Sequence, residues 1–161
     1  MIIRTDTPTD YSRIDDVVKS AFPGPDEAGL INRLRANGDI VISLVAVEDG
    51  LVVGHVLFSR MEAPFKALGL GPASVAPERQ RNGIGSALVK EGIKRAADNG
   101  WQGIFVLGDP KFYQRFGFNE AAATGFSSPY AGPHFMALSL NVELPVKTGR
   151  VAYPPAFAAL G

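Results

Sequence analysis

The chain reads Arg79-Gln80-Arg81-Asn82-Gly83-Ile84-Gly85 between a predicted strand and a segment with helical periodicity. From Gly83 onward, apolar residues recur on one helical face and charged residues on the other, which predicts a helix ending at Asn99-Gly100. A helix N-terminus presents unpaired backbone N–H groups and a partial positive charge. The glycines allow close approach of the backbone and Arg79 and Arg81 add charge, so the segment predicts a site for phosphate oxygens.

A dinucleotide-binding loop is the main alternative at this point. Asp109 ends the next predicted strand, where a ribose-binding acid is expected in that class of protein. Two details oppose this interpretation. Residues 77–82 separate the preceding strand from the first glycine, and bulky Leu88 occupies the third glycine or alanine position of the fingerprint. A more general phosphate-binding loop therefore remains open.

The segments before the loop predict a strand, two helices and an antiparallel meander. Glu48-Asp49-Gly50 joins two runs rich in β-branched residues and is typical of a hairpin turn. Gly69, Gly71 and Pro72 interrupt the third strand of the meander, which indicates a bulge or a splayed end. We expect strands at 2–4, 40–47, 51–58 and 67–76, and helices starting near residues 10 and 26.

The segments after the loop predict a crossover and an irregular tail. A buried-type strand at 102–107 follows the predicted helix, so the strands on either side of that helix should be parallel. A short helix is expected at 111–115, with strands near 116–121 and 135–142. The length suits one domain, with residues 1–142 forming its body and residues 143–161 packing on it as an irregular extension.

Composition excludes several classes of function. The 16 basic and 16 acidic residues cancel, and no long run of like charge occurs, so nucleic acid is not an expected partner. Cysteine is absent, which excludes a disulfide, a thiolate metal site and a cysteine nucleophile, and no metal is expected. No signal sequence or long apolar run appears, so we expect a cytoplasmic protein without a membrane partner.

Taken with its surroundings, the loop resembles the GCN5-related N-acetyltransferase (GNAT) superfamily. Residues 80–85 match that family's signature Gln/Arg-x-x-Gly-x-Gly/Ala, and residues 112–118 are similar to its Tyr-x-x-x-Gly-Phe segment. The order of expected elements over residues 2–142 also follows the family. Residues 107–113 and 153–157 look like a bacterial subgroup of predicted acetyltransferases.

The resemblance implies an α/β fold in which a central, mostly antiparallel sheet, flanked by helices, splays at a parallel pair. Acetyl-coenzyme A would be the acyl donor, with its pantetheine between residues 73–76 and 104–107. Tyr113 would be the general acid, and the N–H of Val75 would stabilise the oxyanion. Asp109 departs from the asparagine that other members carry there. By the resemblance, the coenzyme residues are Ser74, Val75, Ala76, Arg79, Gln80, Arg81, Asn82, Gly83, Ile84, Gly85, Ser86, Asp109, Phe112, Tyr113 and Phe116.

The acceptor side is less defined. The resemblance implies direct attack by an amine of a small molecule or a protein, and a non-catalytic acyl-coenzyme A-binding module is the alternative. Glu27, His55 and His134 are candidates for the general base, each with an alternative structural role. Homodimer formation is left open. Five aromatic residues either line an acceptor pocket or fill the core: Phe22, Phe58, Phe65, Phe126 and Tyr130.

Overall fold

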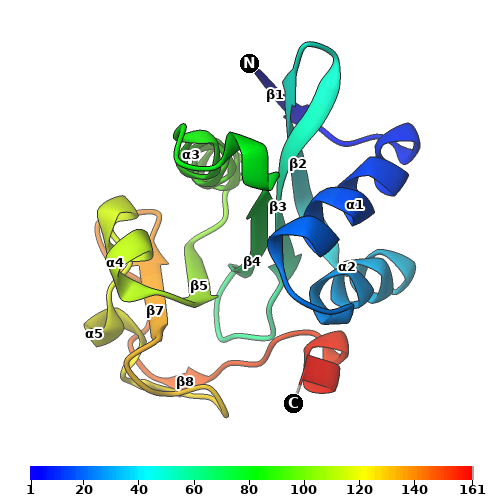
Figure 1. Ribbon diagram of the computed structural model, residues 1–161. Helices are drawn as coiled ribbons and strands as arrows, with labels where there is room; N and C mark the ends of the chain where they lie inside the picture. The colour runs from blue at the N-terminus through cyan, green and yellow to red at the C-terminus, as the bar shows by residue number, and fades with distance from the viewer. Residues whose placement is uncertain (161) are drawn as a thin grey trace.

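A six-stranded mixed sheet with helices on both faces forms the body of the computed structural model, which describes residues 1–160 (Figure 1). The strand order is β1-β2-β3-β4-β5-β7, and a two-stranded sheet pairs β6 with β8. The strands are β1 (Ile2–Thr5), β2 (Ile40–Glu48), β3 (Leu51–Arg60), β4 (Ala67–Val75), β5 (Gly103–Leu107), β6 (Phe126–Ser127), β7 (Phe135–Ser139) and β8 (Gly149–Arg150). The α-helices are α1 (Tyr11–Ala21), α2 (Asp26–Ala36), α3 (Ile84–Asp98), α4 (Pro110–Tyr113) and α5 (Glu120–Ala123).

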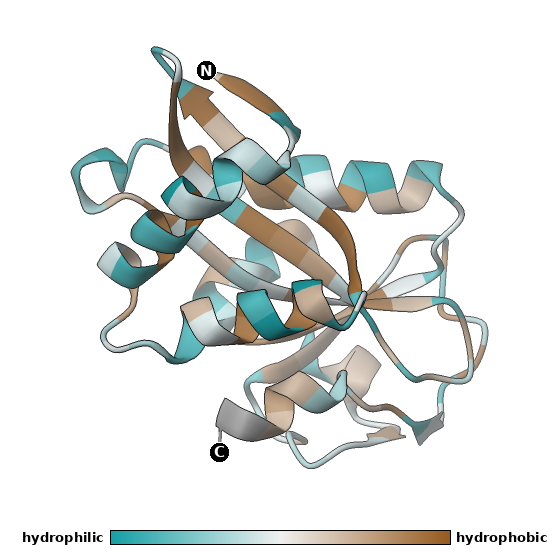
Figure 2. Cartoon of the chain, turned by 90° about the vertical axis from the view of Figure 1, so that its right-hand side faces the viewer, coloured by the Kyte–Doolittle hydropathy of each residue, from teal (hydrophilic) through white to brown (hydrophobic). Residues whose placement is uncertain are grey.

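The helices cover the two faces of the sheet because its central strands are apolar on both sides. Leu44 and Phe58 belong to the core that includes residues of α3, whereas Val45 and Leu57 belong to the core that includes residues of α1 and α2. Figure 2 shows the strands largely in brown between helices of mixed teal and brown. Within residues 1–160, no helix has the length and apolar character needed to cross a bilayer.

The sheet opens between β4 and β5. These strands pair in parallel from Ala67↔Gly103 to Leu70↔Val106, and beyond that point β5 pairs only with β7. The rest of β4 stays on β3, where the register shifts between Val56 and Phe58. The expected parallel pair and its splay are therefore confirmed, and the gap begins where glycine and proline interrupt β4.

The segment after α4 differs from the expectation. A strand was expected at 116–121, but only an isolated bridge between Asn119 and Ala137 forms there, and α5 begins at Glu120. The Asn119 side chain accepts a hydrogen bond of 2.8 Å from the N–H of Ala122, and an N-cap with alanines behind it favours a helix. The strand prediction was wrong because this capping signal was missed.

Two neighbouring boundaries also differ. The helix expected at 111–115 divides into α4 and a 3-10 turn at Gln114–Phe116. The last strand of the sheet stops at Ser139 rather than at residue 142. There the Ser139 hydroxyl donates to the carbonyl of Asn141 and accepts from its N–H, so local bonds replace the strand ladder.

The C-terminal segment returns across the sheet. It contains β8 and a 3-10 helix, Pro155–Leu160, which lies beside α2 (Figure 1). Leu144 and Val151 are buried in the core that also holds Phe105. A Cβ at Gly69 on β4 would lie 2.7 Å from a ring carbon of Tyr153, so the glycine allows Tyr153 to lie directly on the strand. The segment therefore brings aromatic residues to the opening in the sheet.

Candidate functional site

The loop between β4 and α3 curls back on the strand that it leaves. Arg81 and Gly83 have positive φ values of 68° and 78°, and Gly83 is the N-cap of α3. The side-chain amide of Gln80 donates to the carbonyl of Val75 at 3.0 Å. The first helical bond joins the N–H of Ala87 to the carbonyl of Gly83 at 3.0 Å. The N–H groups of the first turn are thus available to a ligand.

A cavity of about 910 Å³ connects this loop to the gap in the sheet. Its walls include the splayed end of β4, the first turn of α3, the end of β5 and α4. The sequence-predicted coenzyme residues that line it are Ser74, Val75, Arg79, Gln80, Arg81, Gly83, Ile84, Gly85, Ser86, Asp109, Phe112 and Tyr113.

Three predicted residues do not line the cavity. Ala76 is buried, and its N–H donates to the carbonyl of Val53 at 2.8 Å. Asn82 is exposed in the loop. Phe116 packs behind Phe112, with ring centroids 5.2 Å apart.

Arg115 lines the same cavity although the sequence analysis did not select it. Its guanidinium donates to the hydroxyl of Ser86 at 3.0 Å and lies 4.7 Å from the ring centroid of Phe112. A third arginine thus joins Arg79 and Arg81 in the wall of the cavity. The sequence carried no signal for this, because the contact joins two turns that are far apart in the chain.

Tyr113 lies in a tight aromatic setting. A Cβ at Gly108 would overlap its ring, and its ring meets those of Phe112 and Phe118 edge-on at centroid distances of 4.9 and 5.9 Å. Burial, with a smaller contribution from Asp109, raises the pKa of the Tyr113 phenol to about 12. The phenol therefore keeps its proton at neutral pH and can act as a hydrogen-bond donor.

A second wall of the cavity is aromatic. It contains Phe22, Tyr130, Tyr153 and Phe157, and Tyr153 lies 5.6 Å from Tyr130 and 4.6 Å from Phe157 between ring centroids. Two of these residues, Phe22 and Tyr130, were among the aromatic candidates. The other three candidates do not line the cavity: Phe58 and Phe126 are fully buried, and Phe65 is partly buried and stacks on Phe105.

Several polar atoms in the cavity wall lack a protein partner. Glu27 Oε2, Ser74 Oγ and the Tyr153 hydroxyl are inaccessible and make no hydrogen bond within the described part of the chain. Burial, with smaller effects of Tyr130 and Tyr113, raises the pKa of Tyr153. Buried polar groups are normally paired, so Glu27, Ser74 and Tyr153 carry polar atoms that the described part of the protein leaves unpaired beside the cavity.

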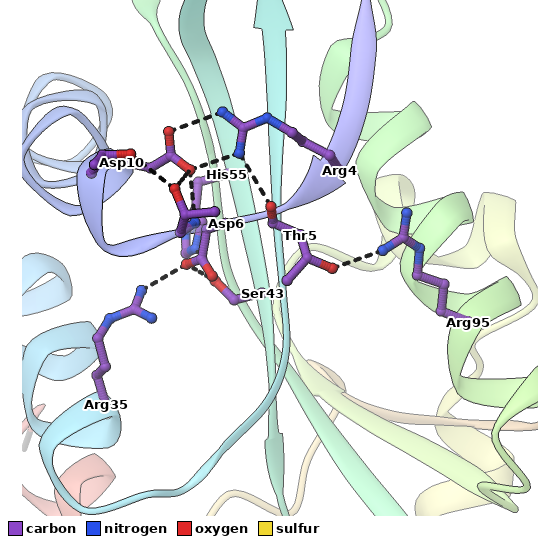
Figure 3. A network of polar contacts seen from close by, with 10 residues as sticks. Arg4, Thr5, Asp6, Asp10, Arg35, Ser43, His55 and Arg95 are labelled. Atoms are coloured by element: carbon purple, nitrogen blue, oxygen red, sulfur yellow. Dashed lines mark hydrogen bonds and ion pairs between the residues drawn. The ribbon is translucent and has the colours of Figure 1, made fainter.

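His55 belongs to a buried polar network rather than to the cavity (Figure 3). Ser43 Oγ donates to Asp6 Oδ2 at 2.6 Å, and Arg35 donates to the same oxygen at 2.9 Å. Ser43 has one proton, so the 2.8 Å contact with His55 Nε2 requires His55 to donate. Burial and the nearby Arg35 charge lower the pKa of His55 to about 3. These contacts support the structural role of His55.

His134 also lies outside the cavity wall. Its side chain is exposed, and Nδ1 lies 3.1 Å from the carbonyl of Gly108. Glu27 is the one residue among the three candidate bases that lines the cavity. Within residues 1–160, no group of three histidine, aspartate or glutamate side chains could hold a metal ion.

The split parallel pair and the loop at the start of α3 are the features of the GNAT acetyltransferase fold. Residues 39–120 match the acetyltransferase (GNAT) domain, and the chain belongs to this family. The uncharacterized N-acetyltransferase YhbS of Escherichia coli K12 is 36% identical over 126 residues, which cover 76% of this chain and 75% of YhbS. YjhQ of the same organism, also an uncharacterized N-acetyltransferase, is 34% identical over 89% of this chain and 86% of its own.

Solved structures agree with this assignment. The crystal structure of Escherichia coli YhbS in complex with CoA superposes with a TM-score of 0.93 at 32% identity, covering 99% of this chain and 93% of YhbS. A GNAT family acetyltransferase from Brucella melitensis, in complex with acetyl-CoA, has a TM-score of 0.82 at 35% identity and covers 97% of both chains.

Proposed function

We propose that this protein transfers an acetyl group from acetyl-coenzyme A to a primary amine. The observation that carries the proposal is the single cavity that joins the loop at the N-terminus of α3 to the gap between β4 and β5. The related structures that hold CoA or acetyl-CoA support the same ligand.

The cavity wall suits the two halves of the donor. The pyrophosphate binds to the N–H groups of the first turn of α3, with Arg79, Arg81 and Arg115 supplying charge. The pantetheine is extended and amide-rich, so it bonds to the edge of β4 that β5 has left.

The N–H of Val75 is the proposed oxyanion donor. The next N–H, that of Ala76, donates to Val53 on β3. Successive N–H groups of a strand point to opposite edges, so that of Val75 points away from β3. The same holds for the Val75 carbonyl, which accepts from Gln80 rather than from β3. This geometry supports a donor aimed at the gap.

The proposed reaction is a direct attack in a ternary complex. The amine nitrogen bonds to the thioester carbon, the carbonyl oxygen takes up negative charge beside the Val75 N–H, and the carbon–sulfur bond then breaks. The acceptor loses its ammonium proton to solvent before the attack. The departing thiolate receives the Tyr113 proton, the nitrogen gives up its second proton to solvent to yield the amide, and solvent reprotonates the Tyr113 phenolate. Burial raises the pKa of Tyr113 to about 12, so the phenol is protonated and available as the proton donor to the thiolate.

Calorimetry with acetyl-coenzyme A tests the donor assignment. We expect saturable binding, and we expect Arg115→Ala to weaken it about tenfold, since a charge-assisted bond contributes roughly 1.5–3 kcal/mol. Lys90→Ala removes an exposed charge on α3 outside the cavity and should change nothing. Folded protein that takes up neither acetyl-coenzyme A nor coenzyme A would contradict the proposal.

A binding module without turnover would use the same donor site. The continuation of the cavity beyond Tyr113 into the aromatic wall favours an enzyme, because a sensor of the coenzyme alone does not need a second compartment. Release of coenzyme A from acetyl-coenzyme A in the presence of an amine distinguishes the two functions.

A further inference from the structure

The aromatic wall and Glu27 form a part of the cavity whose residues lie outside the donor loop. We call it the acceptor chamber and define it by residues of the α1–α2 connection, of α2, of the β6–β7 connection and of the C-terminal segment: Phe22, Glu27, Leu30, Tyr130, Tyr153 and Phe157. Phe22 and Phe157 pack against the core formed with α1 and α2, on the opposite face of the sheet from α3. No chamber residue belongs to the loop, to β4 or to α4.

Glu27 is the only charged member of the acceptor chamber. Its Oε2 is inaccessible and has no hydrogen-bond partner, and no ion pair of Glu27 forms among the described residues. Glu27 therefore has a carboxylate in the cavity wall that neither a cation nor a hydrogen-bond donor of the described residues satisfies. The acceptor of an acetyltransferase enters as an ammonium, which supplies both.

The rest of the acceptor chamber is suited to an apolar body. Tyr153 meets Tyr130 edge-on at 5.6 Å and lies at 4.6 Å from Phe157, and Phe22 and Leu30 add carbon surface from the other side of the chain. Aromatic rings also attract a cation that lies over their faces. The inaccessible hydroxyl of Tyr153 is one polar exception, and it has no partner within the described chain.

The charges of the whole cavity argue against a polycation. Its acidic residues are Glu27 and Asp109, and the Asp109 side chain already accepts a hydrogen bond of 3.0 Å from the N–H of Lys111. Its basic residues are Arg79, Arg81 and Arg115. A polyamine or an aminoglycoside carries several ammonium groups, each of which needs its own carboxylate or water on desolvation.

We infer that the acceptor chamber binds a small primary amine with one positive charge and an aromatic or branched aliphatic body, its ammonium at Glu27 and its body against the aromatic rings. The inference rests on the proposed function for the role of this amine as acceptor. Its binding to the chamber is measurable without turnover.

Isothermal titration calorimetry tests this inference, with 2-phenylethylamine titrated into protein that is saturated with coenzyme A. We expect saturable binding at least about tenfold tighter than that of spermidine or kanamycin, and we expect 2-phenylethanol, which lacks the charge, to bind more weakly. Glu27→Gln should weaken amine binding about tenfold, with acetyl-coenzyme A binding unchanged. Asp26→Asn is the matched control, because it removes a charge from the same helical turn at an exposed position outside the cavity.

Three results would overturn the inference. The first is that 2-phenylethylamine does not bind, and the second is that spermidine or kanamycin binds as tightly as 2-phenylethylamine. The third is that Glu27→Gln binds 2-phenylethylamine with the same affinity as the unchanged protein. Phe22→Ala gives an independent check, since loss of the aromatic ring should weaken the binding of 2-phenylethylamine and leave the binding of the coenzyme unchanged. If acetyl-coenzyme A binds and spermidine is acetylated instead, the acceptor inference fails and the proposed function stands. If acetyl-coenzyme A does not bind, the proposed function fails, and titration without coenzyme still tests the chamber.

Discussion

Tyr113 and Glu27 are the two residues whose side-chain environments define opposite parts of the proposed reaction. Tyr113 packs against Gly108 and against two aromatic rings, and burial raises the pKa of its phenol to about 12, so the phenol is protonated. Glu27 is held by a helix and has a carboxylate oxygen without a partner. A donor of a proton on the coenzyme side and an anion on the acceptor side together match amine acetylation.

Tyr113→Phe tests the proton donor. The ring stays in place, so the binding of acetyl-coenzyme A should change little, whereas kcat should fall about a hundredfold because general acid catalysis contributes at least that factor. Steady-state kinetics and calorimetry on the same preparation measure the two effects. An unchanged kcat would remove Tyr113 from the reaction and leave the donor site as it is.

At the scale of elements, the contact of α3 with β3 holds the first turn of α3 beside the gap. Gly92 on α3 faces Phe58, and a Cβ at that position would overlap the Phe58 ring. Gly54 on β3 similarly faces Ile84 and Leu88, each 3.0 Å from where its Cβ would lie. Glycine on each side therefore sets the short distance between helix and sheet.

Gly92→Ala should lower the free energy of unfolding by about 1–3 kcal/mol, because the added methyl group overpacks the core around Phe58. Gly29→Ala is the matched control. It lies inside α2 with no atom within 4 Å of the added Cβ, and it should raise stability by about 0.5–1 kcal/mol. Urea unfolding measures both variants, and equal effects of the two changes would refute this account of the contact.

At the scale of the whole molecule, a polar network joins β1 and the residues after it to β2, β3 and α2 (Figure 3). Arg4 binds both oxygens of Asp10 at 2.7 and 3.0 Å, and the Arg4 guanidinium holds the pKa of that carboxyl well below its usual range. His55 stays neutral in the folded protein because burial lowers its pKa to about 3. The folded state therefore resists protonation at both places.

Stability should fall on acidification. Between an unfolded pKa of about 6.5 and the folded pKa of about 3, only the unfolded protein protonates His55, so the free energy of unfolding falls by at most about 1.4 kcal/mol per pH unit. Below the ordinary pKa of Asp10, the loss of its pairing acts in the same direction.

Urea unfolding at pH 7, 6, 5 and 4 measures this slope. His55→Gln keeps an amide donor for Ser43 but cannot titrate, so its stability at neutral pH is lower and its dependence on pH should be shallower. An identical slope in the two proteins would show that His55 does not carry the effect.

The sequence by itself determined the order of most elements and the loop that leads into α3. Three local patterns encode local backbone preference: the helical periodicity from Gly83, the Asp49-Gly50 turn and the signature at 80–85. The same reasoning failed for residues 116–121, where the cap at Asn119 was overlooked. Of the predicted coenzyme residues, twelve line the cavity, and Ala76, Asn82 and Phe116 lie outside its wall.

The tertiary structure alone decided which distant side chains line the cavity together. Glu27, Tyr130, Tyr153 and Arg115 reach one cavity from separate segments, and no spacing in the chain records such a meeting. Phe22 and Phe58 have the same chemistry in the sequence, yet one lines the cavity and the other is buried in the core. The physical reason is that burial depends on how the helices and the returning C-terminal segment pack on the sheet, which is a property of distant contacts.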